Sequence, residues 1–128
     1  MADKLSSRQQ AQLGLLQTFP PRLEQMHRLI EEFASLRTAD DTVIRRLCRL
    51  LDATKIAADG VGLNTLADTM GNMSTMARRG GGTQMKIRGL REALQSLRIN
   101  FEGAVREASR EEKEKEEEEK PDGGEGGA

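Results

Sequence analysis

Few residues in this chain of 128 carry side chains suited to nucleophilic, acid–base or metal chemistry. The sequence holds one histidine, His27, and one cysteine, Cys48. One histidine and one distant cysteine do not make a zinc cluster, and no second histidine is present to activate the Cys48 thiol. We therefore expect no catalytic residue, no metal and no cofactor. Cys48 is expected to be a small core side chain, and His27 to lie at the edge of a helix's buried stripe.

The remaining polar residues of interest fall in one helical stretch, and their spacing places them on one face. With a period of about 3.6 residues, Asp52 projects away from the buried side marked by Leu47 and shares the exposed side with two arginines. A branched apolar residue on that side, Ile56, favours contact with a partner. The alternative is an ordinary solvated surface, with Asp52 loosely paired to Arg49 and Ile56 exposed singly, as is common.

Apolar residues recur at intervals of three and four along nearly the whole chain, which predicts amphipathic helices separated by prolines and glycines. These helices are expected at residues 5–17, 21–37, 41–59, 63–79 and from 83 onward. Long amphipathic helices with short connections form antiparallel bundles. We therefore expect an all-α fold, with an N-terminal helix in residues 1–19, an antiparallel four-helix bundle in 20–108 and an acidic disordered tail in 109–128.

Composition and charge narrow the class of protein. Hydrophobic residues make up 36% of the chain, and its only aromatic residues are three phenylalanines, which argues against a β-sandwich or barrel. Residues 111–125 hold nine acidic residues and three lysines, which leaves a net charge of +5 on the rest. That body is too weakly basic, and too poor in aromatic side chains, to predict nucleic-acid binding. The acidic tail is expected to mask the basic body or to hold a partner.

The sequence also favours a cytoplasmic protein without a membrane segment. No apolar run approaches the ~18–20 residues that a membrane-spanning helix needs. The first residues lack the basic and then apolar pattern of a signal peptide. A single cysteine suits a reducing compartment.

The segment from residue 50 to residue 67 carries a recognisable pattern. A lysine, a pair of small residues, and a glycine with an apolar residue that open the next helix stand at Lys55, Ala57, Ala58, Gly62 and Leu63. Val61, Leu66 and Ala67 extend the match. This pattern resembles the signature of histidine phosphotransfer domains and of the related phosphoacceptor domains of chemotaxis-type histidine kinases. The resemblance extends over residues 20–106, where the number and order of expected helices agree with the family.

The sequence departs from the family pattern at the phosphoacceptor itself. Asp52 stands in place of the histidine, Thr54 in place of a leucine, and Ile56 in place of a glycine. Phosphorylating a carboxylate requires a cation-lined pocket, which a convex helix face does not provide. The resemblance therefore implies a non-catalytic adaptor of a two-component or chemotaxis-like system that binds a receiver domain or a histidine kinase without relaying phosphate. Its expected partner-binding face consists of Arg45, Arg49, Asp52, Lys55, Ile56 and Asp59.

Two other hypotheses remain open. The chain is an active phosphotransfer protein if His27 accepts phosphate, although no lysine–glycine context surrounds that residue. It is a self-associating structural protein if the last helix forms a dimer seam through Leu90, Leu94, Leu97 and Phe101. Three methionines at positions 70, 73 and 76 are interpreted as core residues rather than as an adaptable binding patch.

Overall fold

The computed structural model describes the backbone of residues 2–35 and 41–119, and the side chains of residues 7–35 and 41–110. Every regular element in these residues is a helix, which confirms the all-α prediction. The helices are α1 (Ala2–Gln17), α2 (Phe19–Ser35), α3 (Asp41–Gly60), α4 (Asn64–Arg78) and α5 (Thr83–Glu119). Their starts and ends agree closely with the spacing of apolar residues and of helix-breaking residues.

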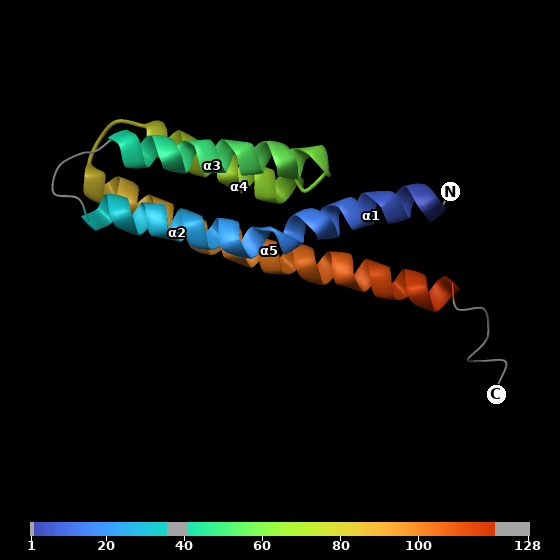
Figure 1. The fold of residues 1–128 in the computed structure, drawn as a ribbon. Coiled ribbons are helices and arrows are strands. Elements are labelled where there is room, and N and C mark those ends of the chain that lie inside the picture. Colours follow the sequence, from blue (N-terminus) through green and yellow to red (C-terminus); the bar gives the residue numbers. More distant parts are fainter. Residues whose placement is uncertain (1, 36–40, 120–128) are drawn as a thin grey trace.

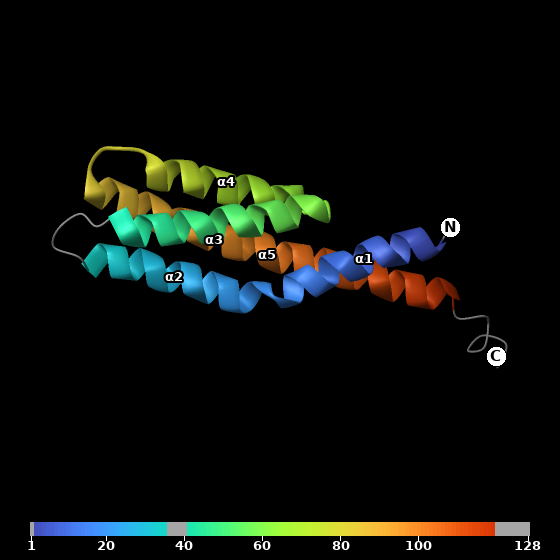
Figure 2. The same ribbon diagram turned by 45° about the horizontal axis from the view of Figure 1, so that its top comes forward.

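The helices α2, α3, α4 and α5 pack side by side, and successive helices run in opposite directions (Figures 1 and 2). Each of them contacts its two neighbours, in the order α2, α3, α4, α5 and back to α2. The first helix continues the direction of α2 and packs mainly on the second half of α5, beyond the ends of α3 and α4 (Figure 1). The molecule therefore has a four-helix part and a two-helix extension.

The core is a continuous set of apolar side chains from all five helices. Leu47 and Leu51 of α3, Met70 and Met73 of α4, and Leu90 of α5 have no exposed surface. Fully burying an aliphatic side chain of this size is worth roughly 1.5–3 kcal/mol. This apolar seam is the main force that holds the outer face of α3 in place.

Aromatic stacking joins the two parts of the molecule. The rings of Phe19 and Phe101 lie parallel, with centroids 5.5 Å apart and an angle of 7° between their planes. Phe19 is the first residue of α2, so the two prolines that follow lie in the first helical turn. The first turn tolerates proline because its N–H groups have no partner inside the helix. The helix therefore starts at Phe19, before both prolines, whereas we had expected it to start at residue 21.

The turn between α3 and α4 depends on glycine and on contacts with α1. Gly62 has a φ of 81°, a left-handed conformation that glycine adopts without steric cost. The Gln12 side chain of α1 donates a hydrogen bond of 2.8 Å to the Val61 carbonyl oxygen, and the Arg8 guanidinium lies against Gly62. These contacts hold the turn that sets the register between α3 and α4.

One expected boundary, at the start of the acidic tail, differs from the structure. The helix α5 continues through residues 109–119, where we had expected disorder, because glutamate and lysine are strong helix formers even without an apolar face. The rest of the expected tail, residues 120–128, lies outside the described residues. The expected N-terminal helix packs on the rest of the chain, since Leu16 belongs to the common core.

The residues of the hypothetical dimer seam on α5 are covered by other helices of the same chain. Leu90, Leu94 and Leu97 are at least 96% buried, and Phe101 is partly buried against Phe19. These residues pack on other helices of the same chain and are not available to a second copy. The heptad-like spacing of α5 therefore reflects its position in the bundle.

A candidate partner-binding face on α3

The outward face of α3 carries the six residues that the sequence predicted, and none of them is buried. Arg45, Arg49, Ile56 and Asp59 are exposed, whereas Asp52 and Lys55 are partly covered by α4. The Ile56 side chain is 72% exposed, one of three large apolar residues so exposed among those described. We call Arg45, Arg49, Asp52, Lys55, Ile56 and Asp59 the α3 face.

Asp52 is tied to α4 rather than to its own helix. Its Oδ1 atom accepts a 2.8 Å hydrogen bond from the Ser74 hydroxyl, and its Oδ2 atom forms a short ion pair with the Arg78 guanidinium. Arg78 also donates to the Ser74 hydroxyl oxygen at 2.7 Å. The expected loose pairing of Asp52 with Arg49 is wrong, because the α4 backbone brings two better placed donors to the same carboxylate.

These contacts set the charge state of Asp52. Partial burial raises the pKa of the carboxyl group, whereas hydrogen bonds from Arg78 and Ser74 lower it. The positive charges of Arg78 and Lys55 lower the pKa further, so the net pKa lies below its ordinary value. Asp52 is therefore an ionised carboxylate at physiological pH. Its charge is balanced by Arg78, and both of its oxygens accept hydrogen bonds.

Lys55 reaches across α4 at the only glycine of that helix. A β-carbon built on Gly71 would lie 3.4 Å from the Lys55 Cε atom, so the lysine stem lies directly over the α4 backbone. Apolar stems of lysine commonly cover a surface in this way and leave the ammonium in water. The glycine thus lets Lys55 lie flat over α4, with its Nζ atom 3.6 Å from the same β-carbon position.

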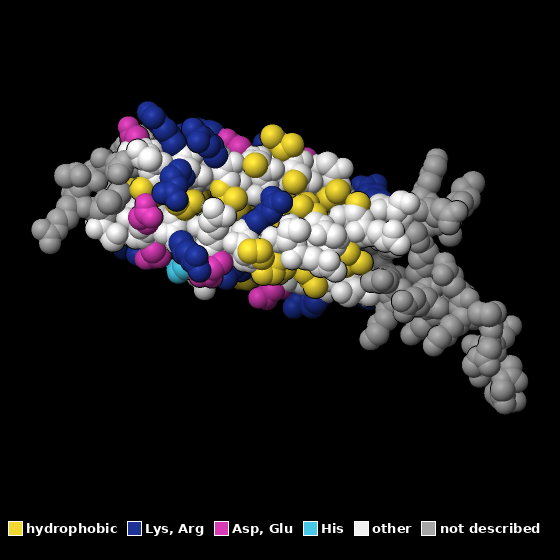
Figure 3. Space-filling model, viewed as in Figure 1, with side chains coloured by type: hydrophobic (Ala, Val, Ile, Leu, Met, Phe, Trp, Pro, Cys, Tyr) yellow, Lys and Arg dark blue, Asp and Glu magenta, His cyan; other side chains and the backbone are white. Residues whose placement is uncertain are grey.

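Basic side chains gather toward the end of the molecule where α3 begins (Figure 3). Arg45 and Arg49 are exposed there and make no ion pair within the described part of the chain. Arg46, by contrast, faces Glu32 of α2 at 3.7 Å. The outer edge of the α3 face thus offers two positive charges to a partner, beside the exposed Ile56.

Beneath this face the core has a polar contact that anchors α3 to α2. The Thr54 side chain is fully buried. Its hydroxyl donates to the Leu50 carbonyl oxygen at 2.7 Å and accepts a hydrogen bond from Arg22 at 3.2 Å. A buried hydroxyl satisfied on both sides costs little stability, so a threonine is accommodated at this core position.

The other residues singled out in the sequence take structural positions. Cys48 is 95% buried, as expected of a core side chain. Met70 and Met73 are fully buried, and Met76 is packed against the core. His27 is exposed on α2 and lines a groove between α2 and α5, away from the α3 face. The α3 face and His27 are therefore separate features of the surface.

No arrangement for metal-dependent chemistry is found among the residues whose side chains the structure describes. These residues contain no group of three His, Cys, Asp or Glu side chains positioned for an ion. The carboxylate at the centre of the α3 face is neutralised by Arg78 and has no imidazole partner among its contacts. Chemically, the α3 face can bind through charge and apolar contact.

Sequence reasoning missed Ser74 and Arg78, although a signal for them existed. They stand four residues apart, a spacing that puts both side chains on the same side of a helix. Knowing that α3 and α4 are antiparallel about the Gly62 turn would have placed that side opposite Asp52. The register of the two helices was the missing information.

The fold and the face together define an all-helical protein with an exposed surface of basic, acidic and apolar residues and without a recognisable catalytic centre in its described part. No helix in that part has the length and apolar character needed to cross a membrane. Comparison of the chain with protein-family models, with curated proteins and with solved structures finds no match.

Proposed function

We propose that the protein is a non-catalytic adaptor that docks the α3 face on a receiver domain or a histidine kinase of a two-component or chemotaxis-like system. The observation that carries the proposal is Ile56, an exposed isoleucine with arginines on its own face of α3. Protein-binding surfaces commonly place an apolar centre inside a charged and polar rim, with arginine among the enriched residues.

The charge of the α3 face supports this choice of partner. The resemblance implies a receiver domain whose acidic pocket is ringed by apolar residues. Arg45 and Arg49 would face that acidic pocket, and Ile56 would meet its apolar rim. Asp52 would add little repulsion, because Arg78 already neutralises it.

The same geometry argues for docking without phosphate relay. A carboxylate that accepts a phosphoryl group needs a free oxygen and a cation or metal to stabilise the leaving group. Both Asp52 oxygens are engaged by Arg78 and Ser74. We therefore propose a histidine-phosphotransfer-like bundle that has kept a docking surface and lost its nucleophile.

A binding assay with matched variants tests the proposal. Purified receiver domains and kinase phosphoacceptor domains from the same cell are titrated against the full chain by calorimetry or surface plasmon resonance. Ile56→Glu and Arg49→Glu should each weaken binding at least about tenfold, since a lost buried contact or reversed charge costs more than ~1.4 kcal/mol. Both residues are exposed, so the helical content should not change.

Ile99→Glu is the matched control. Ile99 is 62% exposed on α5, and α5 is the one helix of the four-helix part that does not contact α3. This variant should bind as the parent chain does. If no receiver or kinase domain binds, or if Ile56→Glu and Ile99→Glu bind equally, the adaptor proposal is wrong.

Phosphotransfer is measured in the same samples with acetyl phosphate and with phosphorylated receiver domains. We expect no stable label on the chain, and Gln in place of His27 should change nothing. Label on Asp52 would contradict the absence of relay. Label that disappears in His27→Gln would establish the active phosphotransfer alternative instead.

A further inference from the structure

A second surface feature lies between α2 and α5, apart from the α3 face. It is a groove of about 270 Å³. Its floor contains Ile30 and Leu94, which belong to the core. Its walls are polar and are formed by His27, Glu31, Arg91, Gln95 and Arg98.

The acidic residue of the groove, Glu31, is paired with Arg91. Both oxygens of Glu31 accept hydrogen bonds from Arg91, from Nε at 2.8 Å and from Nη2 at 2.7 Å. These hydrogen bonds are the main reason that the pKa of Glu31 lies below its ordinary value, although partial burial opposes them. Such bidentate pairs are geometrically specific. Both oxygens of Glu31 are therefore engaged by Arg91.

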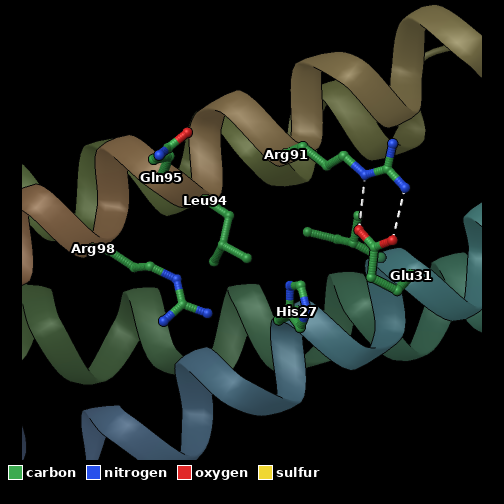
Figure 4. A pocket seen from close by; sticks show the side chains of 7 residues that line it. His27, Glu31, Arg91, Leu94, Gln95 and Arg98 are labelled. Carbon is green, nitrogen blue, oxygen red and sulfur yellow. Dashed lines mark hydrogen bonds and ion pairs between the residues drawn. The ribbon is translucent and has the colours of Figure 1, made fainter.

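The other arginine of the groove is left without a counter-charge. Arg98 is half-buried, and it makes no hydrogen bond or ion pair with any side chain that the structure describes. Figure 4 shows its guanidinium extending from α5 into the groove, toward the side of α2 that carries His27. A partly desolvated guanidinium beside an imidazole forms a site of positive potential that an anion can fill.

We propose that this groove binds a phosphate group, held by the Arg98 guanidinium and the His27 imidazole. Arginine presents a planar fork of donors that matches phosphate oxygens, and the imidazole adds an N–H donor. The apolar floor excludes part of the water and strengthens both contacts. The binding is non-covalent and is independent of the adaptor function proposed for the α3 face.

Phosphate is favoured over a carboxylate by charge. Near neutral pH a phosphate group carries ~1.5–2 negative charges, whereas a carboxylate carries one. The Arg98 fork and the imidazole N–H together can engage the three acceptor oxygens of a phosphate group, whereas a carboxylate has two. The groove is open to solvent, so either a phosphorylated side chain of a partner or a free phosphate compound can reach it.

The only histidine of the chain makes a direct test possible. The ring proton and carbon signals of His27 are followed by NMR while inorganic phosphate is added to the full chain at constant pH and ionic strength. The signals should shift and saturate. In Arg98→Gln the apparent affinity should fall about tenfold or more, because a charge-assisted hydrogen bond is lost.

Arg106→Gln is the matched control, since Arg106 is an exposed arginine of the same helix that does not line this groove. It removes one charge as Arg98→Gln does and should leave the phosphate titration unchanged. Circular dichroism verifies that both variants keep their helices. A phosphoserine peptide and acetate are then titrated in the same way. The peptide should compete with inorganic phosphate, and acetate should bind more weakly.

Three outcomes would overturn the site. Shifts of His27 that stay linear with phosphate concentration would show that no site exists. Equal titrations in Arg98→Gln and the parent chain would remove Arg98 from it. Acetate that saturates at the same concentration as phosphate would show that the groove does not select phosphate.

Discussion

Asp52 of α3 and Arg78 of α4 form an ion pair across the seam between the two helices, and Ser74 donates a hydrogen bond to the same carboxylate. The arrangement makes the centre of the α3 face part of a structural network. It also engages both oxygens of the Asp52 carboxylate with side chains of α4. Its consequences can be measured in stability as well as in binding.

The ion pair predicts a specific dependence of stability on pH. The pKa of Asp52 is lowered in the folded state from 3.8, so the unfolded state binds the proton more readily. The stabilisation of the folded state by ionised Asp52 is fully present above pH ~4. It is lost as the pH falls through the lower pKa that Asp52 has in the folded state. Because the carboxylate and the guanidinium are 40% and 57% exposed, the effect is discounted to roughly 0.2–1 kcal/mol.

Urea denaturation measures this contribution when the parent chain and Asp52→Asn are compared between pH ~2 and pH ~7, in steps of ~0.5 pH unit. The free-energy difference should be constant near neutrality and should shrink in acid. Asp68→Asn, which alters an exposed carboxylate of α4 outside every ion pair of the described residues, is the control. A difference that grows in acid would contradict the assigned direction of the pKa shift.

Core truncation on α5 should strongly destabilise the folded chain. Leu97 has no exposed surface, so Leu97→Ala leaves a cavity and is expected to cost about 2–5 kcal/mol of unfolding free energy. Met85→Ala on the same helix, where the side chain is 81% exposed, should change it by less than about 0.5 kcal/mol. Sedimentation of both variants should be the same. Dissociation of a dimer by Leu97→Ala, without loss of monomer stability, would restore the seam that the structure assigns to the core.

Two glycines should respond to alanine in opposite directions. Gly62 has a positive φ of 81°, so Gly62→Ala forces strain on the turn between α3 and α4 and should destabilise the chain by about 1 kcal/mol. Gly14 lies in α1 with open space around a β-carbon, and Gly14→Ala should stabilise by about 0.5–1 kcal/mol. Thermal or urea unfolding of both variants compares the signs directly. Stabilisation by Gly62→Ala would be inconsistent with the observed turn.

The acidic run at the end of the chain should weaken binding to an acidic partner. Removing residues 111–128 changes the net charge of the chain from −1 to +5, which strengthens long-range attraction and its dependence on salt. The affinity of the truncated chain for a receiver domain should therefore be higher at low salt, and the gain should disappear at high salt. Exchanging the glutamates of 111–119 for glutamine, at unchanged length, should have the same effect. Loss of affinity in both variants would show that the run itself contacts the partner.

The amino-acid sequence by itself determined the helices of this protein. Apolar residues at intervals of three and four set the buried stripe of α2, and glycine at positions 60 and 62 ended α3 where the turn now lies. The outward position of Ile56 also followed from helix geometry alone. All of these features depend on neighbours within a few residues, so local spacing is sufficient to predict them.

Only the tertiary structure decided which charges meet. Arg78 and Asp52 are 26 residues apart in the chain, and Arg91 and Glu31 are 60 apart. Such pairs depend on the register and rotation of whole helices, which are fixed by the packing of the common core and not by any local pattern. The same packing buried the apolar stripe of α5 against other helices of the chain. It also placed Arg98 and His27 along one groove. The chemistry of both candidate sites therefore arises from contacts that the periodicity of the sequence does not encode.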